Sequence, residues 1–180
     1  MNIAAFGNNA GFTGVVTKPT TFTATGAETV YDTTGTMVLS LNGVLFSKAA
    51  VTDGATPTLD ANTGSAFVAL IGGGSVANTP GQATKFLWMV NSVGTVKVAQ
   101  ALRSPGLLAG FPLDMNGNYT AQGGKPNLPP VPEGYVPFAI MTVKAGATAS
   151  ASGWLLGTSN WNASGVTVSI EDIGSLPNRP

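Results

Sequence analysis

Few residues in this chain carry the chemistry of an active site. The 180 residues include no histidine and no cysteine, so the usual general bases, thiolate nucleophiles and thiolate metal ligands are missing. The carboxylates are Glu28, Asp32, Asp53, Asp60, Asp114, Glu133, Glu171 and Asp172. Two carboxylates about 5 to 10 Å apart are enough for glycoside hydrolysis, but no spacing singles out such a pair. No segment has the alternating oxygen ligands of a calcium loop. The sequence therefore predicts a protein that is not an enzyme and holds no metal or cofactor.

A run of three glycines at residues 72–74 is a second chemical candidate, because glycine-rich loops can cradle phosphate groups. Neither Lys-Ser nor Lys-Thr follows the run at the required spacing, and residues 76–81 are typical of a loop. We therefore interpret the glycines as a turn.

The tryptophans are the remaining candidates, since their rings could stack on sugars or bases. A core position is expected for Trp88, which lies in a strongly apolar run. Trp161 is different, because it lies among short polar residues (GTSNWN, residues 157–162) that favour turns. Trp161 is therefore a candidate partner-binding residue.

Two hairpins are the clearest structural predictions. Residues 37–46 hold two apolar runs joined by Asn42-Gly43, and both central residues of a type I′ turn need positive φ, which Asn and Gly tolerate. Residues 84–91 and 94–100 form the second predicted hairpin. Apolar side chains fill both alternating faces of residues 86–90, so this strand is expected to be buried on both sides.

Further strands are predicted at residues 28–32, 66–71, 134–144 and 166–172. Residues 134–144 are apolar on both faces, which predicts a central strand. Its predicted faces are Tyr135, Ala139, Met141 and Val143 against Val136, Phe138 and Ile140. Residues 166–172 alternate apolar and polar side chains, which predicts a strand with one face in water.

Many short strands between Gly/Pro turns, with no sustained helical pattern, predict an all-β fold, an antiparallel β-sandwich or jelly-roll-like single domain over residues 28–180. Residues 103–133 are rich in proline and glycine, and we expect a long loop there or an excursion to a neighbour. Residues 174–180 are a short C-terminal tail. Residues 1–27 are predicted to form an extended N-terminal arm with isolated aromatics, so Phe6, Phe12 and Phe22 join Trp161 as candidate partner-binding residues.

The composition points to assembly with other chains. Only 9% of residues are charged and the net charge is zero, so nothing in the charge pattern suits nucleic acid or an anionic membrane. No apolar run approaches the roughly 20 residues of a membrane span, and the first residues lack the features of a secretion signal. A surface this short of charge is expected to be covered partly by other chains, and a homo-oligomer, a trimer by preference, is predicted.

Several stretches resemble structural proteins of tailed bacteriophages, particularly the head decoration or cement class. The stretches are residues 41–50 (LNGVLFSKAA), 94–100 (GTVKVAQ), 131–139 (VPEGYVPFA), 157–163 (GTSNWNA) and 176–180 (LPNRP). The resemblance covers roughly residues 36–180. It implies a β-sandwich or jelly roll that sits as a homotrimer on the capsid surface of the virion and binds the major capsid protein. A phage tail or fibre component and a carbohydrate-binding surface β-module are the alternatives.

Overall fold

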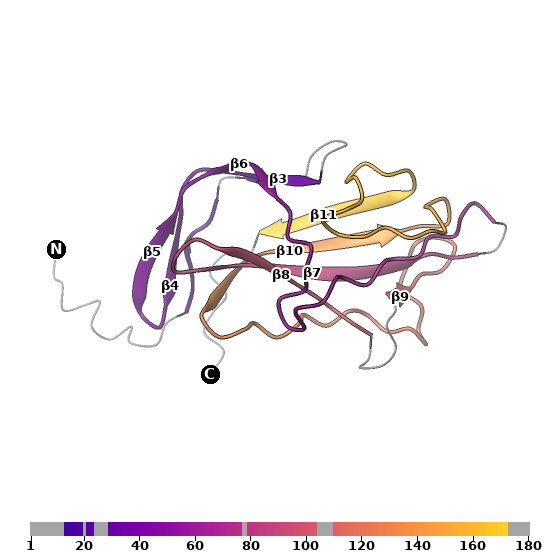
Figure 1. Ribbon diagram of the computed structural model, residues 1–180. Coiled ribbons are helices and arrows are strands. Elements are labelled where there is room, and N and C mark those ends of the chain that lie inside the picture. The colour runs from indigo at the N-terminus through magenta and orange to yellow at the C-terminus, as the bar shows by residue number, and fades with distance from the viewer. Residues whose placement is uncertain (1–12, 20, 24–28, 77–78, 104–109, 173–180) are drawn as a thin grey trace.

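The computed structural model describes residues 13–19, 21–23, 29–76, 79–103 and 110–172. Over these residues the chain is all-β, with three antiparallel sheets and no helix, as the sequence predicts (Figure 1). Sheet A has the order β1 (Gly14–Thr17), β4 (Met37–Leu41), β5 (Val44–Lys48). Sheet B has the order β2 (Thr21–Thr23), β3 (Val30–Thr34), β6 (Val51–Ala55). Sheet C has the order β11 (Val166–Asp172), β10 (Tyr135–Ala145), β7 (Gln82–Asn91), β8 (Val96–Gln100), and β9 (Phe111–Pro112) also pairs with β7.

Both predicted hairpins are confirmed. Strands β4 and β5 pair in regular register from Met37–Lys48 to Leu41–Val44. The turn residues Asn42 and Gly43 have φ angles of 51° and 82°, the positive values that a type I′ turn needs. Strands β7 and β8 form the second hairpin.

Strand β10 is central in sheet C, as predicted, but its two faces differ from the prediction. Pro137 pairs with Met89 and Ala139 pairs with Trp88, so Phe138 is an extra residue in a β-bulge. The bulge shifts the alternation by one residue. Val136 and Phe138 therefore lie on the same face as Ala139 and the buried residues after it, in the main core.

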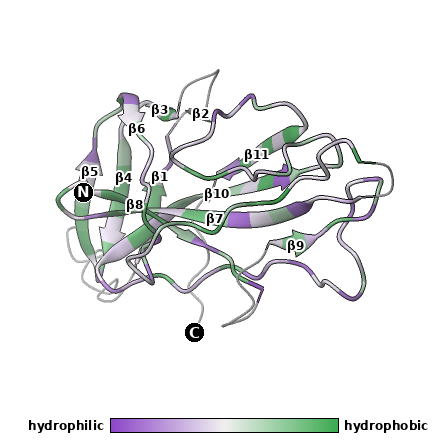
Figure 2. Ribbon diagram, turned by 45° about the vertical axis from the view of Figure 1, so that its right-hand side comes forward, coloured by the Kyte–Doolittle hydropathy of each residue, from purple (hydrophilic) through white to green (hydrophobic). Residues whose placement is uncertain are grey.

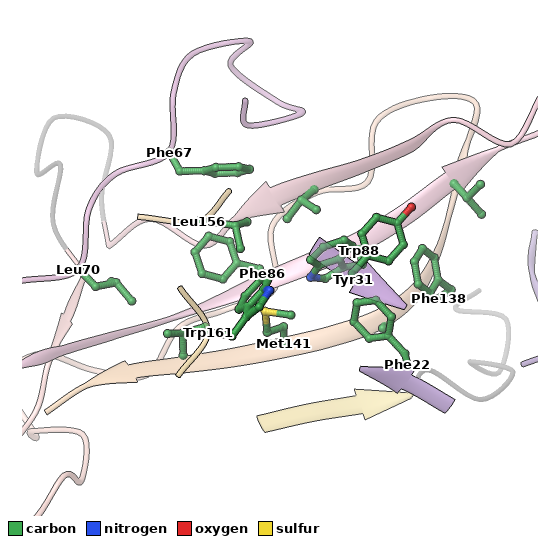
Figure 3. Packing of buried hydrophobic residues seen from close by; sticks show 14 of the residues in the cluster. Phe22, Tyr31, Phe67, Leu70, Phe86, Trp88, Phe138, Met141, Leu156 and Trp161 are labelled. Carbon is green, nitrogen blue, oxygen red and sulfur yellow. The ribbon is translucent and has the colours of Figure 1, made fainter. Parts of the chain in front are cut away.

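The main core lies between sheet C and the two smaller sheets, and aromatic rings fill its centre (Figure 3). Trp88 of β7 contacts Phe22 of β2 and Tyr31 of β3, with ring centroids 4.9 and 5.0 Å apart. On the other face of β7, Leu87 and Met89 pack in a smaller cluster with Ala99. Strand β7 is thus buried on both faces, as predicted. Strand β11 is half-buried, as predicted, with Val166, Val168 and Ile170 against the core.

The strand predicted at residues 66–71 is absent, and this prediction is wrong. The segment makes only isolated bridges, Leu59 with Ala66 and Leu70 with Trp154. Glutamine side chains satisfy part of its backbone instead. Gln100 accepts from the Val68 N–H at 2.7 Å and donates to the Val68 carbonyl at 2.8 Å. A side chain therefore takes the place of a neighbouring strand.

Residues 14–17 and 21–23, inside the predicted arm, form β1 and β2 and belong to the sheets. Strand β6 is also absent from the prediction, because Asp53-Gly54 has the sequence of a turn. In the structure Asp53 lies within the strand at a φ of 50°, and its N–H donates to Asp32 Oδ1 at 2.7 Å. The register of β3 and β6 shifts at this point.

Candidate functional site

Two of the four candidate partner-binding residues lie in the core. Phe22 is 5% exposed and packs edge-on against Phe138 as well as Trp88. Trp161 is 4% exposed, and its Nε1 donates to the Val30 carbonyl at 2.8 Å. Both side chains therefore stabilise the fold and present no surface to a partner in this structure, which differs from the prediction. Phe6 and Phe12 lie outside the described residues.

Two of the described carboxylates, Asp60 and Asp114, accept hydrogen bonds from backbone N–H groups. Asp60 is buried, and its Oδ1 accepts from the N–H groups of Asn62 and Thr63 at 2.9 Å. Its Oδ2 accepts from the Gln100 N–H at 2.6 Å. Three hydrogen bonds of this kind satisfy a buried carboxylate and tie the 60–63 turn to β8. Asp60 is thus a structural residue.

Asp114 organises an exposed turn in the same way. Its Oδ1 accepts from the N–H groups of Asn116 and Asn118 at 2.8 Å, and the Asn118 amide donates to Oδ2 at 3.3 Å. The hydrogen bond from the Asn118 backbone is the main reason that the pKa of Asp114 lies below its ordinary value, and the nearby charge of Lys144 adds to the effect. Lys144 Nζ donates to the Gly117 carbonyl at 2.8 Å and so holds the turn against β10. Among the described residues no three His, Cys, Asp or Glu side chains come together as a metal site.

The glycine run has no free backbone for a phosphate. Gly72, Gly73 and Gly74 donate their N–H groups to the carbonyls of Ser150, Gly146 and Ala149, at 2.8 to 3.0 Å. A Cβ at Gly72 or Gly73 would collide with the 147–149 backbone. The glycines are therefore needed for close packing of two loops, which agrees with their interpretation as a turn.

A hollow of about 550 Å³ lies beside these loops. Neutral hydroxyl and amide side chains line most of it, namely Thr148, Ser150, Thr158, Ser159, Asn160 and Ser164. Trp154 also borders the hollow, but the ring is buried and its Nε1 donates to the Asn160 carbonyl at 2.9 Å. Hydrogen bonding to a neutral polar ligand is possible here, and stacking on an open tryptophan face is not.

The outer edge of sheet A is the described surface that best fits a protein partner. Strand β5 forms this edge at one end of the molecule (Figures 1 and 2). Val44 is 69% exposed and Leu45 is 56% exposed, although both lie in a regular strand. Solvent-exposed aliphatic side chains on an open strand edge are a template for pairing with another chain.

Four of the other described edge strands, β1, β6, β8 and β11, have features that hinder the addition of a further strand. Strands β1 and β6 each take part in a pairing with a register shift, and such irregularities hinder the addition of a further strand. The edge of β8 is covered, since Val98 accepts a hydrogen bond from the Ala61 N–H at 2.8 Å. The exposed side chains of β11 are polar, with Glu171 among them. Strand β5 pairs with β4 without any bulge.

The sequence predicts the hairpin that contains β5 but not its place at an edge. Val44 and Leu45 look like ordinary strand residues, because the pattern along one strand does not tell which strands lie beside it. The only signal is that Val44, Leu45 and Phe46 are consecutive apolar residues, which a strand with one solvent face does not need.

No helix in the described part of the chain is long and apolar enough to cross a membrane. No protein-family model matches this chain, and no curated protein or solved structure has significant similarity to it.

Proposed function

We propose that this chain is a non-enzymatic structural protein of a tailed-bacteriophage virion, a capsid decoration or cement protein that binds the major capsid protein lattice and stabilises the head. The proposal begins from the resemblance of residues 36–180 to that class. Asp60 and Asp114 are consistent with it, because both carboxylates are used to hold turns.

The observation that carries the proposal is the open edge of β5. A strand whose outer edge pairs with no other described strand, and that exposes Val44 and Leu45, is a liability for a protein that stays alone in solution. In an assembly, a neighbouring chain can cover the β5 edge and remove these apolar side chains from water. The low content of charged residues fits the same use, since charge keeps protein surfaces apart.

Co-sedimentation with capsids tests this function. Heads are purified from a phage mutant that lacks the gene, and the purified chain is added at micromolar concentration. We expect the chain to sediment with expanded heads up to a fixed number of copies, and to raise the temperature at which the heads break open. A chain that stays in the supernatant at every ratio contradicts the proposal, and a chain that binds only purified tails supports the tail or fibre alternative.

The hollow near Trp154 favours a second candidate, a module that binds carbohydrate. Its neutral hydroxyl and amide lining suits the hydroxyl groups of a saccharide. A glycan array tests this candidate with the parent chain and the Ser164→Trp variant, in which an indole at an exposed position of the rim obstructs the hollow. Binding that the variant loses supports a saccharide site, and no binding to any glycan removes this candidate.

A further inference from the structure

We infer that the open edge of β5 is the acceptor for residues 1–12 of a second copy of this chain, which add to sheet A as a further strand. The inference rests on the proposed function only in that a shell protein assembles with copies of itself.

The register of the hairpin shows which backbone groups of β5 point away from β4. Across a two-residue turn the flanking pair, Leu41 with Val44, exchanges hydrogen bonds, and the pattern then repeats at every second residue. Val44, Phe46 and Lys48 therefore direct their N–H and C=O groups toward β4. Leu45 and Ser47 direct theirs away from the sheet. An added strand would bond to these two residues.

The start of the described chain lies at the same end of sheet A. Thr13 Oγ1 donates to Asn42 Oδ1 at 3.3 Å and accepts from the Asn42 N–H at 3.0 Å. Asn42 is in the turn that leads into β5. Thr13, the first described residue, therefore lies beside the turn from which the open edge begins.

The length and chemistry of this segment fit the edge. Twelve extended residues reach about 40 Å, and the five residues of β5 need about 17 Å. Residues 1–12 (MNIAAFGNNAGF) contain no Asp, Glu, Lys or Arg, and they bring Ile3 and Phe6 to a surface that presents Val44 and Leu45. Residues 1–12 and the exposed positions Val44 and Leu45 carry no charged side chain, and the only charged residue of β5 is Lys48 at its far end.

The geometry favours a second copy over the same copy. Strands β1 and β5 both run antiparallel to β4, so they run in the same direction and lie about 10 Å apart with β4 between them. To pair with its own β5, the segment before Thr13 would have to cross the hairpin turn and reverse its direction. A second copy can present the segment without that reversal. Passing the segment from each copy to the next, or exchanging it between two copies, closes an assembly in which every β5 edge is filled.

Amide hydrogen exchange, measured by NMR on the full chain, tests directly whether the outward N–H groups of β5 are hydrogen-bonded. We expect the full chain to have at least twice the monomer mass by light scattering at 100 µM, with slow exchange at Leu45 and Ser47. Deleting residues 1–12 should give a monomer in which these two amides exchange at least about 100-fold faster. Val44 and Phe46 are internal controls, because their amides bond to β4 in both chains. A full-length monomer, or fast exchange at Leu45 and Ser47 in the oligomer, overturns the inference.

A proline substitution distinguishes the role of the outer β5 edge from that of the β4–β5 pairing. Ser47→Pro removes an outward N–H at an exposed position and leaves the bonds between β4 and β5 in place, whereas Ser47→Ala keeps the N–H. We expect Ser47→Pro to be a folded monomer and Ser47→Ala to assemble like the parent. If Ser47→Pro does not fold, a synthetic peptide of residues 1–12 added to the deletion chain replaces it as the test. The peptide should restore slow exchange at Leu45 and Ser47, and its failure to do so overturns the inference.

Two other results are informative. Slow exchange at Leu45 and Ser47 in a full-length monomer means that the segment covers its own edge, which contradicts the second-copy arrangement. An oligomer that survives deletion of residues 1–12 with both amides protected means that another strand occupies β5, which also contradicts it. Capsid co-sedimentation remains a separate measurement, so an oligomer formed through β5 that fails to bind heads removes the proposed function and keeps this inference.

Discussion

A single side chain, Phe22, connects several distant parts of the chain in the aromatic core. It comes from a three-residue strand, yet its ring contacts Tyr31, Trp88 and Phe138, with centroids 4.9 to 5.9 Å apart. Isolated aromatics in a Thr- and Gly-rich stretch suggest an arm with nothing to pack against. The partners lie far along the chain, and only the fold brings them together.

Replacing Phe22 with alanine should lower the free energy of unfolding by about 3 to 5 kcal/mol, because a buried ring leaves a cavity. Urea denaturation followed by tryptophan fluorescence measures this loss. Val93→Ala is the control, since Val93 is 83% exposed and its substitution should change stability by less than about 0.5 kcal/mol. A loss under 1 kcal/mol for Phe22→Ala, on the order of the control, would show that the ring is not in the core.

Asp114 should make stability depend on pH in the acid range. Its folded pKa is lower than the ordinary value of 3.8, mainly because of the hydrogen bond from the Asn118 backbone. The stabilising contribution is therefore fully present above the ordinary pKa and is lost as the pH falls through the folded pKa. We expect an NMR titration of the Asp114 carboxyl to give a midpoint below 3.8. Asp114→Asn should weaken the acid dependence of the thermal midpoint, and a carboxyl midpoint above the ordinary value would refute the account of this turn.

At the scale of the structural elements, the backbone of residues 66–71 forms hydrogen bonds with glutamine side chains where a strand would bond to a neighbouring strand. The buried Gln100 bonds to both backbone groups of Val68, and Gln82 Oε1 accepts from the Ile71 N–H at 3.0 Å. These two residues lie on neighbouring strands of sheet C. The two glutamine side chains hold residues 66–71 against the core, where the segment forms only isolated bridges and no continuous strand pairing.

Gln100→Met should cost about 1 to 3 kcal/mol, because it leaves the Val68 N–H and C=O without their partners. The Val68 amide should also exchange faster with solvent. Gln82→Met is the matched comparison, since it removes one bond at a more exposed position and should cost less than about 1 kcal/mol. Equal losses of unfolding free energy in the two variants would mean that the two hydrogen bonds at Val68 stabilise the fold no more than the single bond at Ile71.

The sequence predicts the elements whose signal is local. Asn42-Gly43 specifies its hairpin, and the apolar residues on both faces of β7 and β10 place these strands inside sheet C. The bulge at Phe138 is not visible in the alternation, because one extra residue reverses every face that follows it. The pairing of β1 and β2 with later strands, and the place of β5 at an edge, depend on topology. Two of the predicted partner-binding residues, Phe22 and Trp161, are therefore buried, and the exposed Val44 and Leu45 were not predicted.

For the whole molecule, the boundary of the arm determines which truncation leaves the domain intact. Strands β1 and β2 begin at Gly14 and Thr21, so the predicted arm of residues 1–27 includes part of two sheets. We expect deletion of residues 1–12 to preserve the β circular-dichroism signal and the thermal transition. Deletion of residues 1–24 removes Val15 and Phe22 from the core and should abolish the cooperative transition or lower its midpoint by more than about 10 °C. Equal transitions for both truncated chains would contradict the assignment of β1 and β2 to the domain.

The central claim is that the chain covers the head of a phage particle as a structural protein. Cryo-electron microscopy of the intact particle, compared with particles from a mutant that lacks the gene, tests it most directly. The account predicts extra density on the outer capsid surface, where capsid subunits meet, that fits the three-sheet domain and disappears in the mutant. Density on the tail alone, or identical particles with and without the gene, would contradict it.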